Sequence, residues 1–109
     1  MNCDIPNLKI EYKSGPGSIS STTIKEQFIE RDIFNANSLN ELQWRMTNTQ
    51  MTKQKLVNWL TEHKSSIEGL GLEKIKSFFP NDNLLISSNF ADRFISKFND
   101  DNFYSLIFK

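Results

Sequence analysis

The sequence predicts an α+β fold, with three to five helices in the middle of the chain and short antiparallel strands near both termini. Three observations support this prediction. Apolar and polar residues alternate near the N-terminus, as in a strand with one buried side. In the middle, apolar residues recur every three or four positions, as along one side of a helix. A short apolar run closes the chain, and chain ends in small domains tend to lie close together.

The length and composition fit one domain spanning residues 1–109. Hydrophobic residues make up 38% of the chain and aromatic residues 12%, which is enough apolar surface for a core. We find no internal repeat, low-complexity run or long linker. Abundant Asn, Lys, Ile, Ser and Phe are typical of an AT-rich genome, such as that of a bacterial accessory element or a phage.

The first element is a strand over residues 7–13, where Leu8, Ile10 and Tyr12 share one side. Residues 14–18, Ser-Gly-Pro-Gly-Ser, form a turn. Residues 19–23 are then either a returning strand, which would complete a hairpin, or a flexible connector.

Two capping boxes mark the next helices. Thr23 with Glu26 predicts a helix that ends before residues 35–37. Ser38 with Glu41 predicts a second helix that carries Leu39, Leu42 and Met46 and stops near residues 47–49.

The second half of the chain predicts three more helices and two short strands. One helix spans residues 52–64, and a shorter one spans residues 72–79, because Pro80 ends it. The clearest amphipathic helix begins after Ser88 or Asn89 and carries Phe90, Ala91, Phe94, Ile95 and Phe98. The strands are predicted at residues 84–86 and 103–108.

Charge and cysteine content exclude several classes of protein. Thirteen basic and thirteen acidic residues cancel, so the chain lacks the positive field of a non-specific nucleic-acid binder. Cys3 is the only cysteine, which excludes an intramolecular disulfide and a thiolate-rich metal site. We expect no cofactor, no metal and no membrane association, and a cytoplasmic location.

The turn between the helices at residues 52–64 and 72–79 contains Gly69, Leu70 and Gly71. With Ile75 and Phe78 following Gly71 at spacings of four and seven, residues 67–78 resemble the helix-hairpin-helix motif of DNA-binding proteins. The resemblance implies that backbone N–H groups bind a DNA phosphate, with Lys74 nearby. Glu73 departs from the motif, because its charge repels phosphate. The alternative interpretation is a glycine helix cap before a short core helix.

A second candidate site is a locally basic segment that contains both tryptophans. Arg45, Lys53 and Lys55 alternate with Trp44 and Trp59, and no acid follows until Glu62. Such a segment either follows a phosphate backbone or belongs to a protein interface, where Trp and Arg are enriched. We favour the interface, because the neutral chain gives no long-range attraction to nucleic acid.

No catalytic site is evident in the sequence. His63, the only histidine, lies on the apolar side of a helix, and we interpret it as a half-buried packing residue. Asp100 and Asp101 are adjacent but fall in a predicted turn, and no metal-ligand or nucleophile motif occurs. The leading hypothesis is therefore a non-enzymatic protein-binding module that inhibits or regulates one partner, as an immunity protein, an antitoxin or a phage inhibitor does. The alternative is a small nucleic-acid-binding factor.

Overall fold

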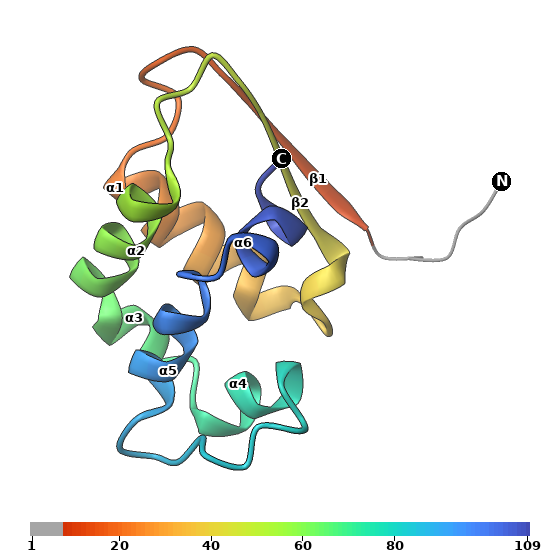
Figure 1. The fold of residues 1–109 in the computed structure, drawn as a ribbon, viewed down its shortest axis with the longest axis vertical. Coiled ribbons are helices and arrows are strands. Elements are labelled where there is room, and N and C mark those ends of the chain that lie inside the picture. The colour runs from red at the N-terminus through yellow and green to blue at the C-terminus, as the bar shows by residue number, and fades with distance from the viewer. Residues whose placement is uncertain (1–7) are drawn as a thin grey trace, which may run out of the picture.

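The structure, a computed structural model, describes residues 8–109 (Figure 1), so the predictions about Cys3 and Asn7 lie outside it. The coarse prediction of an α+β fold is confirmed, but helices outnumber the predicted three to five. The elements, in chain order, are β1 (Lys9–Ser14), α1 (Ser21–Thr23), η1 (Ile24–Ile33), η2 (Leu39–Glu41), β2 (Leu42–Thr47), α2 (Lys53–Glu62), α3 (Lys64–Glu68), α4 (Leu72–Phe78), α5 (Phe90–Lys97) and α6 (Asp101–Ile107).

The predicted antiparallel pairing was wrong, because β1 and β2 are parallel. Their register runs from Lys9 opposite Leu42 to Ser14 opposite Thr47. The helix formed by α1 and η1 lies between them in the chain, and parallel strands require a long crossover of this kind. The chain end reaches the other side of β2, where Phe108 forms a single bridge with Trp44.

The helix after β1 begins earlier than its predicted capping box. The side chain of Ser20 accepts a hydrogen bond from the Thr23 N–H, which makes Ser20 the N-cap in place of Thr23. Residues 19–23 therefore do not form a returning strand, and the N-terminal hairpin is absent. The helix continues through η1, whose ten residues adopt π-helical geometry.

The second predicted helix is instead the short turn η2 followed by β2. Leu39, Leu42 and Met46 fit a helical spacing, but Leu42, Trp44 and Met46 fit a strand spacing equally well. Pairing with β1 and complete burial of Trp44 favour the strand. The Glu41 side chain still makes a capping contact, because it accepts a hydrogen bond from the Asn37 N–H at 3.0 Å.

The later helices follow the predictions more closely. α2, α4 and α5 lie within about two residues of the predicted ranges, and Thr52 caps α2 by accepting from the Lys55 N–H. The two strands predicted near the C-terminus are not present at residues 84–86 and 103–108. Residues 84–86 lie in a loop, and residues 103–107 belong to α6, whose first turn is capped by the Asp100 carboxylate.

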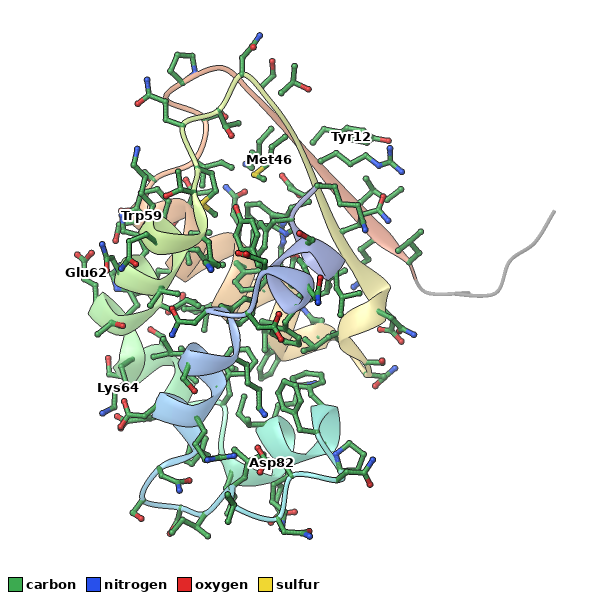
Figure 2. All side chains as sticks on the ribbon, viewed as in Figure 1. Tyr12, Met46, Trp59, Glu62, Lys64 and Asp82 are labelled. Carbon is green, nitrogen blue, oxygen red and sulfur yellow. The ribbon has the colours of Figure 1, made fainter. Side chains whose placement is uncertain are left out.

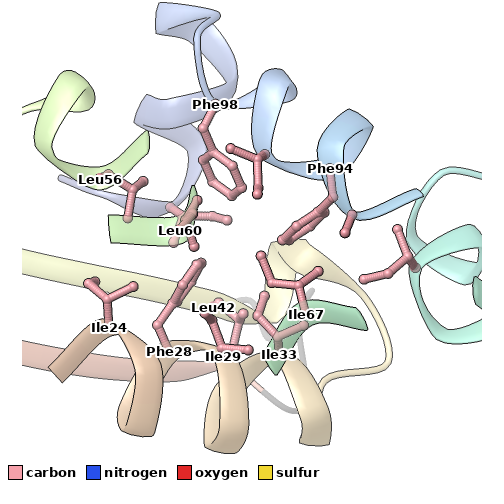
Figure 3. Close-up of a cluster of buried hydrophobic side chains, with 14 of the residues drawn as sticks. Ile24, Phe28, Ile29, Ile33, Leu42, Leu56, Leu60, Ile67, Phe94 and Phe98 are labelled. Atoms are coloured by element: carbon pink, nitrogen blue, oxygen red, sulfur yellow. The ribbon is translucent and has the colours of Figure 1, made fainter. Parts of the chain in front are cut away.

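The core lies between η1, the inner side of β2, and α2 and α5 (Figure 3). Phe28 is fully buried, and its ring meets those of Trp44 and Phe98 edge-on, with centroids 5.8 and 6.1 Å apart. The predicted apolar side of α5 is confirmed, because Phe90, Ala91, Phe94 and Ile95 are all buried.

Candidate protein-binding surface

The apolar side of β1 faces outward. Leu8 and Ile10 are each 38% exposed, and the Tyr12 side chain is 71% exposed (Figure 2). The inward side of the strand is charged instead. Glu11 Oε1 accepts a hydrogen bond from Arg31 Nη2 at 2.8 Å, and Lys13 Nζ donates to Gln27 Oε1 at 2.6 Å. Backbone pairing with β2 and polar contacts with η1 therefore hold the strand, and its apolar side chains remain exposed.

The outward side of β2 continues this surface. In the parallel register Gln43 lies opposite Ile10 and Arg45 opposite Tyr12, so these four side chains share one side of the sheet. Arg45 Nε donates to Gln43 Oε1 at 2.7 Å. We call the side chains of Leu8, Ile10, Tyr12, Gln43 and Arg45 the outer sheet face.

A groove of about 200 Å³ adjoins the outer sheet face at Gln43. Leu39 of η2, Leu106 of α6 and Lys109 are among the residues that line it. The Leu106 side chain is 62% exposed and lies at the mouth of this groove. Gln43 belongs to both the groove and the outer sheet face, so their exposed apolar side chains lie on neighbouring parts of the surface, as at interaction sites.

Trp44, which the sequence suggested as an interface anchor, lies in the core. Its side chain is fully buried, and its Nε1–H donates to Asp32 Oδ2 at 2.9 Å. Adjacent positions in a strand point to opposite sides, so Arg45 alone of this pair reaches the outer sheet face.

The other predicted partner-binding residues lie on α2, away from the sheet. Lys53 Nζ contacts Asp101 Oδ1 and the Asn99 carbonyl oxygen, each at 2.7 Å. Lys55 is exposed, whereas Trp59 is half-buried against the core. Figure 2 shows Trp59 and Tyr12 on opposite sides of the view. The five residues therefore do not form one patch.

The turn at residues 69–71 has the geometry of helix caps. Gly69 is the C-cap of α3 with ordinary helical angles, and Gly71 has φ 93° and ψ 151°, a conformation that only glycine adopts readily. Leu70 packs partly against the core. Lys74 is engaged within the protein, because its Nζ donates to the Ala36 carbonyl oxygen and lies 5.3 Å from the Phe78 ring centroid.

We expect Gly71→Ala to destabilise the protein by about 1 kcal/mol or more, because alanine is strained at this positive φ. Urea unfolding monitored by circular dichroism measures the change. Gly17→Ala is the matched control, since a Cβ meets no atom within 4 Å at either position and only Gly71 has the positive φ. Equal stability of the two variants would contradict the prediction.

His63 contacts a serine that lies 42 positions away in the chain. Ser21 Oγ is 2.7 Å from His63 Nε2, and it donates to Glu62 Oε1 at 2.9 Å. The hydroxyl has one proton, which it can direct to either of these two partners. The contacts link α1 to the end of α2.

Asp82 anchors the loop between α4 and α5. Its carboxylate accepts from Lys97 Nζ at 2.9 Å, and Arg93 Nη2 lies 3.0 Å from both carboxylate oxygens. The hydrogen bond from Lys97, with further ones from the Leu84 N–H and Arg93, lowers the pKa of Asp82 to about 2 from its ordinary 3.8, although burial opposes the change.

This shift predicts a pH dependence of stability. A carboxylate whose pKa is lower in the folded protein stabilises the fold above the ordinary pKa of 3.8, and that stabilisation is lost as the pH falls towards about 2. We expect Asp82→Asn to reduce the loss of stability between about pH 4 and pH 2, measured by urea unfolding at several pH values. Asp92→Asn is the control, because that exposed carboxylate forms a single ion pair, with Lys64, in the described part of the chain. A pH dependence unchanged by Asp82→Asn would contradict the prediction.

Among residues 8–109 no cluster of three or more His, Cys, Asp or Glu side chains is arranged to hold a metal ion. None of the helices described is both long and apolar enough to cross a membrane. Comparisons of the chain with protein-family models, with curated proteins and with solved structures find no match.

Proposed function

We propose that this protein is a non-enzymatic protein-binding module that inhibits or regulates one partner, and that it binds through the outer sheet face and the adjoining groove. One observation supports this most directly: Ile10 and Tyr12 of β1, with Leu8 just before the strand, expose apolar side chains on its outward side. Burying exposed apolar side chains of this size is the main source of affinity in protein association. Tyr12 has the residue type and the exposure of an interface anchor.

The charges around this surface indicate the chemistry of the partner. Arg45 and Lys109 are exposed there, and neither forms an ion pair with another residue in the part of the chain that the structure describes. We infer a partner with an apolar patch flanked by Asp or Glu side chains, because complementary charges speed association and fix the orientation of the complex. An immunity protein, an antitoxin or a phage inhibitor acts in this way, by covering part of its target.

Nothing in the geometry favours the nucleic-acid alternative over this proposal. Lys53 and Lys74, which that alternative would use, both have partners within the protein. Glu73 is exposed in the first turn of α4, where its negative charge opposes a phosphate.

The test is capture of the partner from a lysate of the source cells, followed by calorimetric titration of the purified pair. We expect Tyr12→Ala to weaken binding by about 2 kcal/mol or more, close to 30-fold, and Leu106→Ala to weaken it measurably. Leu84→Ala is the matched control for Leu106→Ala, because the two leucines are 64% and 62% exposed and only Leu106 lies at the groove. The Leu84→Ala variant should bind the partner with the affinity of the wild type.

Two outcomes would overturn the proposal. In the first, Tyr12→Ala and Leu106→Ala bind the captured protein as tightly as the wild type. In the second, the captured molecule is a nucleic acid whose affinity falls steeply between about 50 and 200 mM salt, with a smaller salt dependence after Lys53→Ala and Lys55→Ala together. A protein partner bound through Tyr12 should show only a modest salt dependence.

A further inference from the structure

One edge of β1 has no neighbouring strand within residues 8–109. β2 is paired on both sides, with β1 on one and Phe108 on the other. No strand among residues 8–109 pairs with the far edge of β1, which lies at the periphery of the molecule (Figure 1). Open strand edges tend to pair with another chain, and proteins usually protect them by a bulge, a proline or a covering loop.

Two hydrogen bonds identify the backbone groups on this open edge. The Gly15 N–H donates to the Thr47 carbonyl oxygen, whereas the Lys109 N–H donates to the Trp44 carbonyl oxygen on the other side of β2. The backbone N–H and C=O groups of odd-numbered β2 residues therefore point to β1. In a parallel pair of strands, such a residue forms hydrogen bonds with the residues just before and just after the one that lies opposite it. Because Gln43 lies opposite Ile10, it bonds Lys9 and Glu11. The N–H and C=O groups of Ile10, and of Leu8 and Tyr12 by alternation, point to the open edge.

In one antiparallel register the sequence of β1 matches both its charged and its apolar side chains with complementary partners. When Ile10 lies on a twofold axis, Leu8 is opposite Tyr12 and Lys9 is opposite Glu11. Aromatic–aliphatic pairs and opposite charges both stabilise neighbouring strands. A register centred on Glu11 would instead place Glu11 opposite itself and Lys9 opposite Lys13, which is repulsive. A register centred on Tyr12 also pairs opposite charges, Glu11 with Lys13, but it places Ile10 opposite Ser14. The register centred on Ile10 is favoured because it gives Leu8, Ile10 and Tyr12 all apolar or aromatic partners.

We propose that a second copy of this chain pairs with the open edge of β1, giving a symmetric dimer with a four-stranded sheet in which the two β1 strands are antiparallel neighbours. Hydrogen bonds between the Ile10 residues, and between Leu8 and Tyr12, join the copies. A twofold axis uses the same patch on both subunits, as in most homodimers. The proposal concerns the edge of β1 and does not rest on a partner bound to the outer sheet face.

Disulfide cross-linking tests the register directly, in a Cys3→Ser background so that no other thiol is present. Directly opposite residues of a hydrogen-bonded antiparallel pair have Cα atoms about 5.5 Å apart, within the range that a disulfide spans. Ile10→Cys should therefore form a covalent dimer under mild oxidation. Leu8→Cys alone and Tyr12→Cys alone should not, because identical positions are then four residues apart along the strands, about 13 Å. A mixture of these two variants should cross-link.

Sedimentation equilibrium of the unmodified chain provides the second measurement. We expect a mass that rises with concentration towards twice the 12.7 kDa of one chain. Ile10→Lys should remain monomeric, because it places two like charges opposite each other, and its thermal midpoint should stay near that of the wild-type monomer since the side chain is 38% exposed. Leu84→Lys, at an exposed leucine in the loop between α4 and α5, should dimerise like the wild type.

Either of two results would overturn the proposal. One is a monomeric mass for the wild type up to about 0.5 mM together with no Ile10→Cys cross-link, which means that the edge pairs with a different chain or with none. The other is equal cross-linking of Leu8→Cys and Ile10→Cys, which shows random collision or another register. Loss of partner binding by Tyr12→Ala without a change in mass would leave the dimer standing and would concern the proposed function alone.

Discussion

Phe28→Ala should lower the free energy of unfolding by about 3–5 kcal/mol, the cost expected for removing a fully buried phenyl ring. The Phe28 ring contacts those of Trp44, Phe98 and Phe108, with the Phe108 centroid at 5.2 Å, so no single element can move to fill the cavity. Urea unfolding at constant pH measures the loss. If unfolding ceases to be cooperative, near-ultraviolet circular dichroism will show whether tertiary packing is lost at zero denaturant.

Phe34→Ala is the matched control for this prediction. Phe34 lies six residues further along the same helix, but its side chain is 60% exposed. We expect its removal to change the stability by no more than about 0.5 kcal/mol. A loss below about 1 kcal/mol for Phe28→Ala would show that the packing between η1 and α5 is not the core of this domain.

Trp44→Phe should destabilise the protein by about 2–4 kcal/mol for two separate reasons. The smaller ring leaves a cavity beside Phe28, and loss of the indole N–H removes one of the two hydrogen bonds to the buried Asp32 carboxylate. The remaining donor is Arg31 Nε, 2.7 Å from Asp32 Oδ1. Urea unfolding again provides the measurement.

A double-mutant cycle with Asp32→Ala separates the two reasons. If the indole–carboxylate hydrogen bond matters, the double variant should be more stable than the sum of the single changes predicts, by about 1–2 kcal/mol. Strict additivity would show that the cost of Trp44→Phe comes from packing alone.

The sequence predicted best where one side of a helix carries a strong apolar pattern. α5 is an example, because the apolar pairs Phe90-Ala91 and Phe94-Ile95, followed by Phe98, fit one side of a helix and do not alternate as in a strand. Leu42 and Met46 fit a helix together with Leu39 and a strand together with Trp44, and the choice depended on β1, which is distant in the chain. The strand predicted at residues 103–108 was wrong for a similar reason. Phe, Tyr and Ile favour strands, and the local sign of a helix was the cap at Asp100.

The candidate surface was harder to predict than the fold. Alternation in β1 located a two-sided strand, but the default assumption that its apolar side is buried was wrong. Which side faces the core depends on Arg31 and Gln27, which reach Glu11 and Lys13 from the helix that follows. The groove combines Leu39 with Leu106, which are 67 positions apart. The burial of Trp44 could not be predicted either, because nothing in the sequence near Asp32 indicates that its carboxylate accepts a hydrogen bond from this indole.

The polar attachment of β1 has a consequence for the order in which the molecule assembles. No residue of β1 is fully buried, so the helices and β2 can close over Phe28 and Phe98 before the strand docks. We expect the strand to be the last element to join and the first to leave, and its amide protons to exchange with solvent through local opening at a lower free energy than those of α5. Release of this segment would leave the rest of the domain folded, so we expect β1 to unfold locally and independently of the helices.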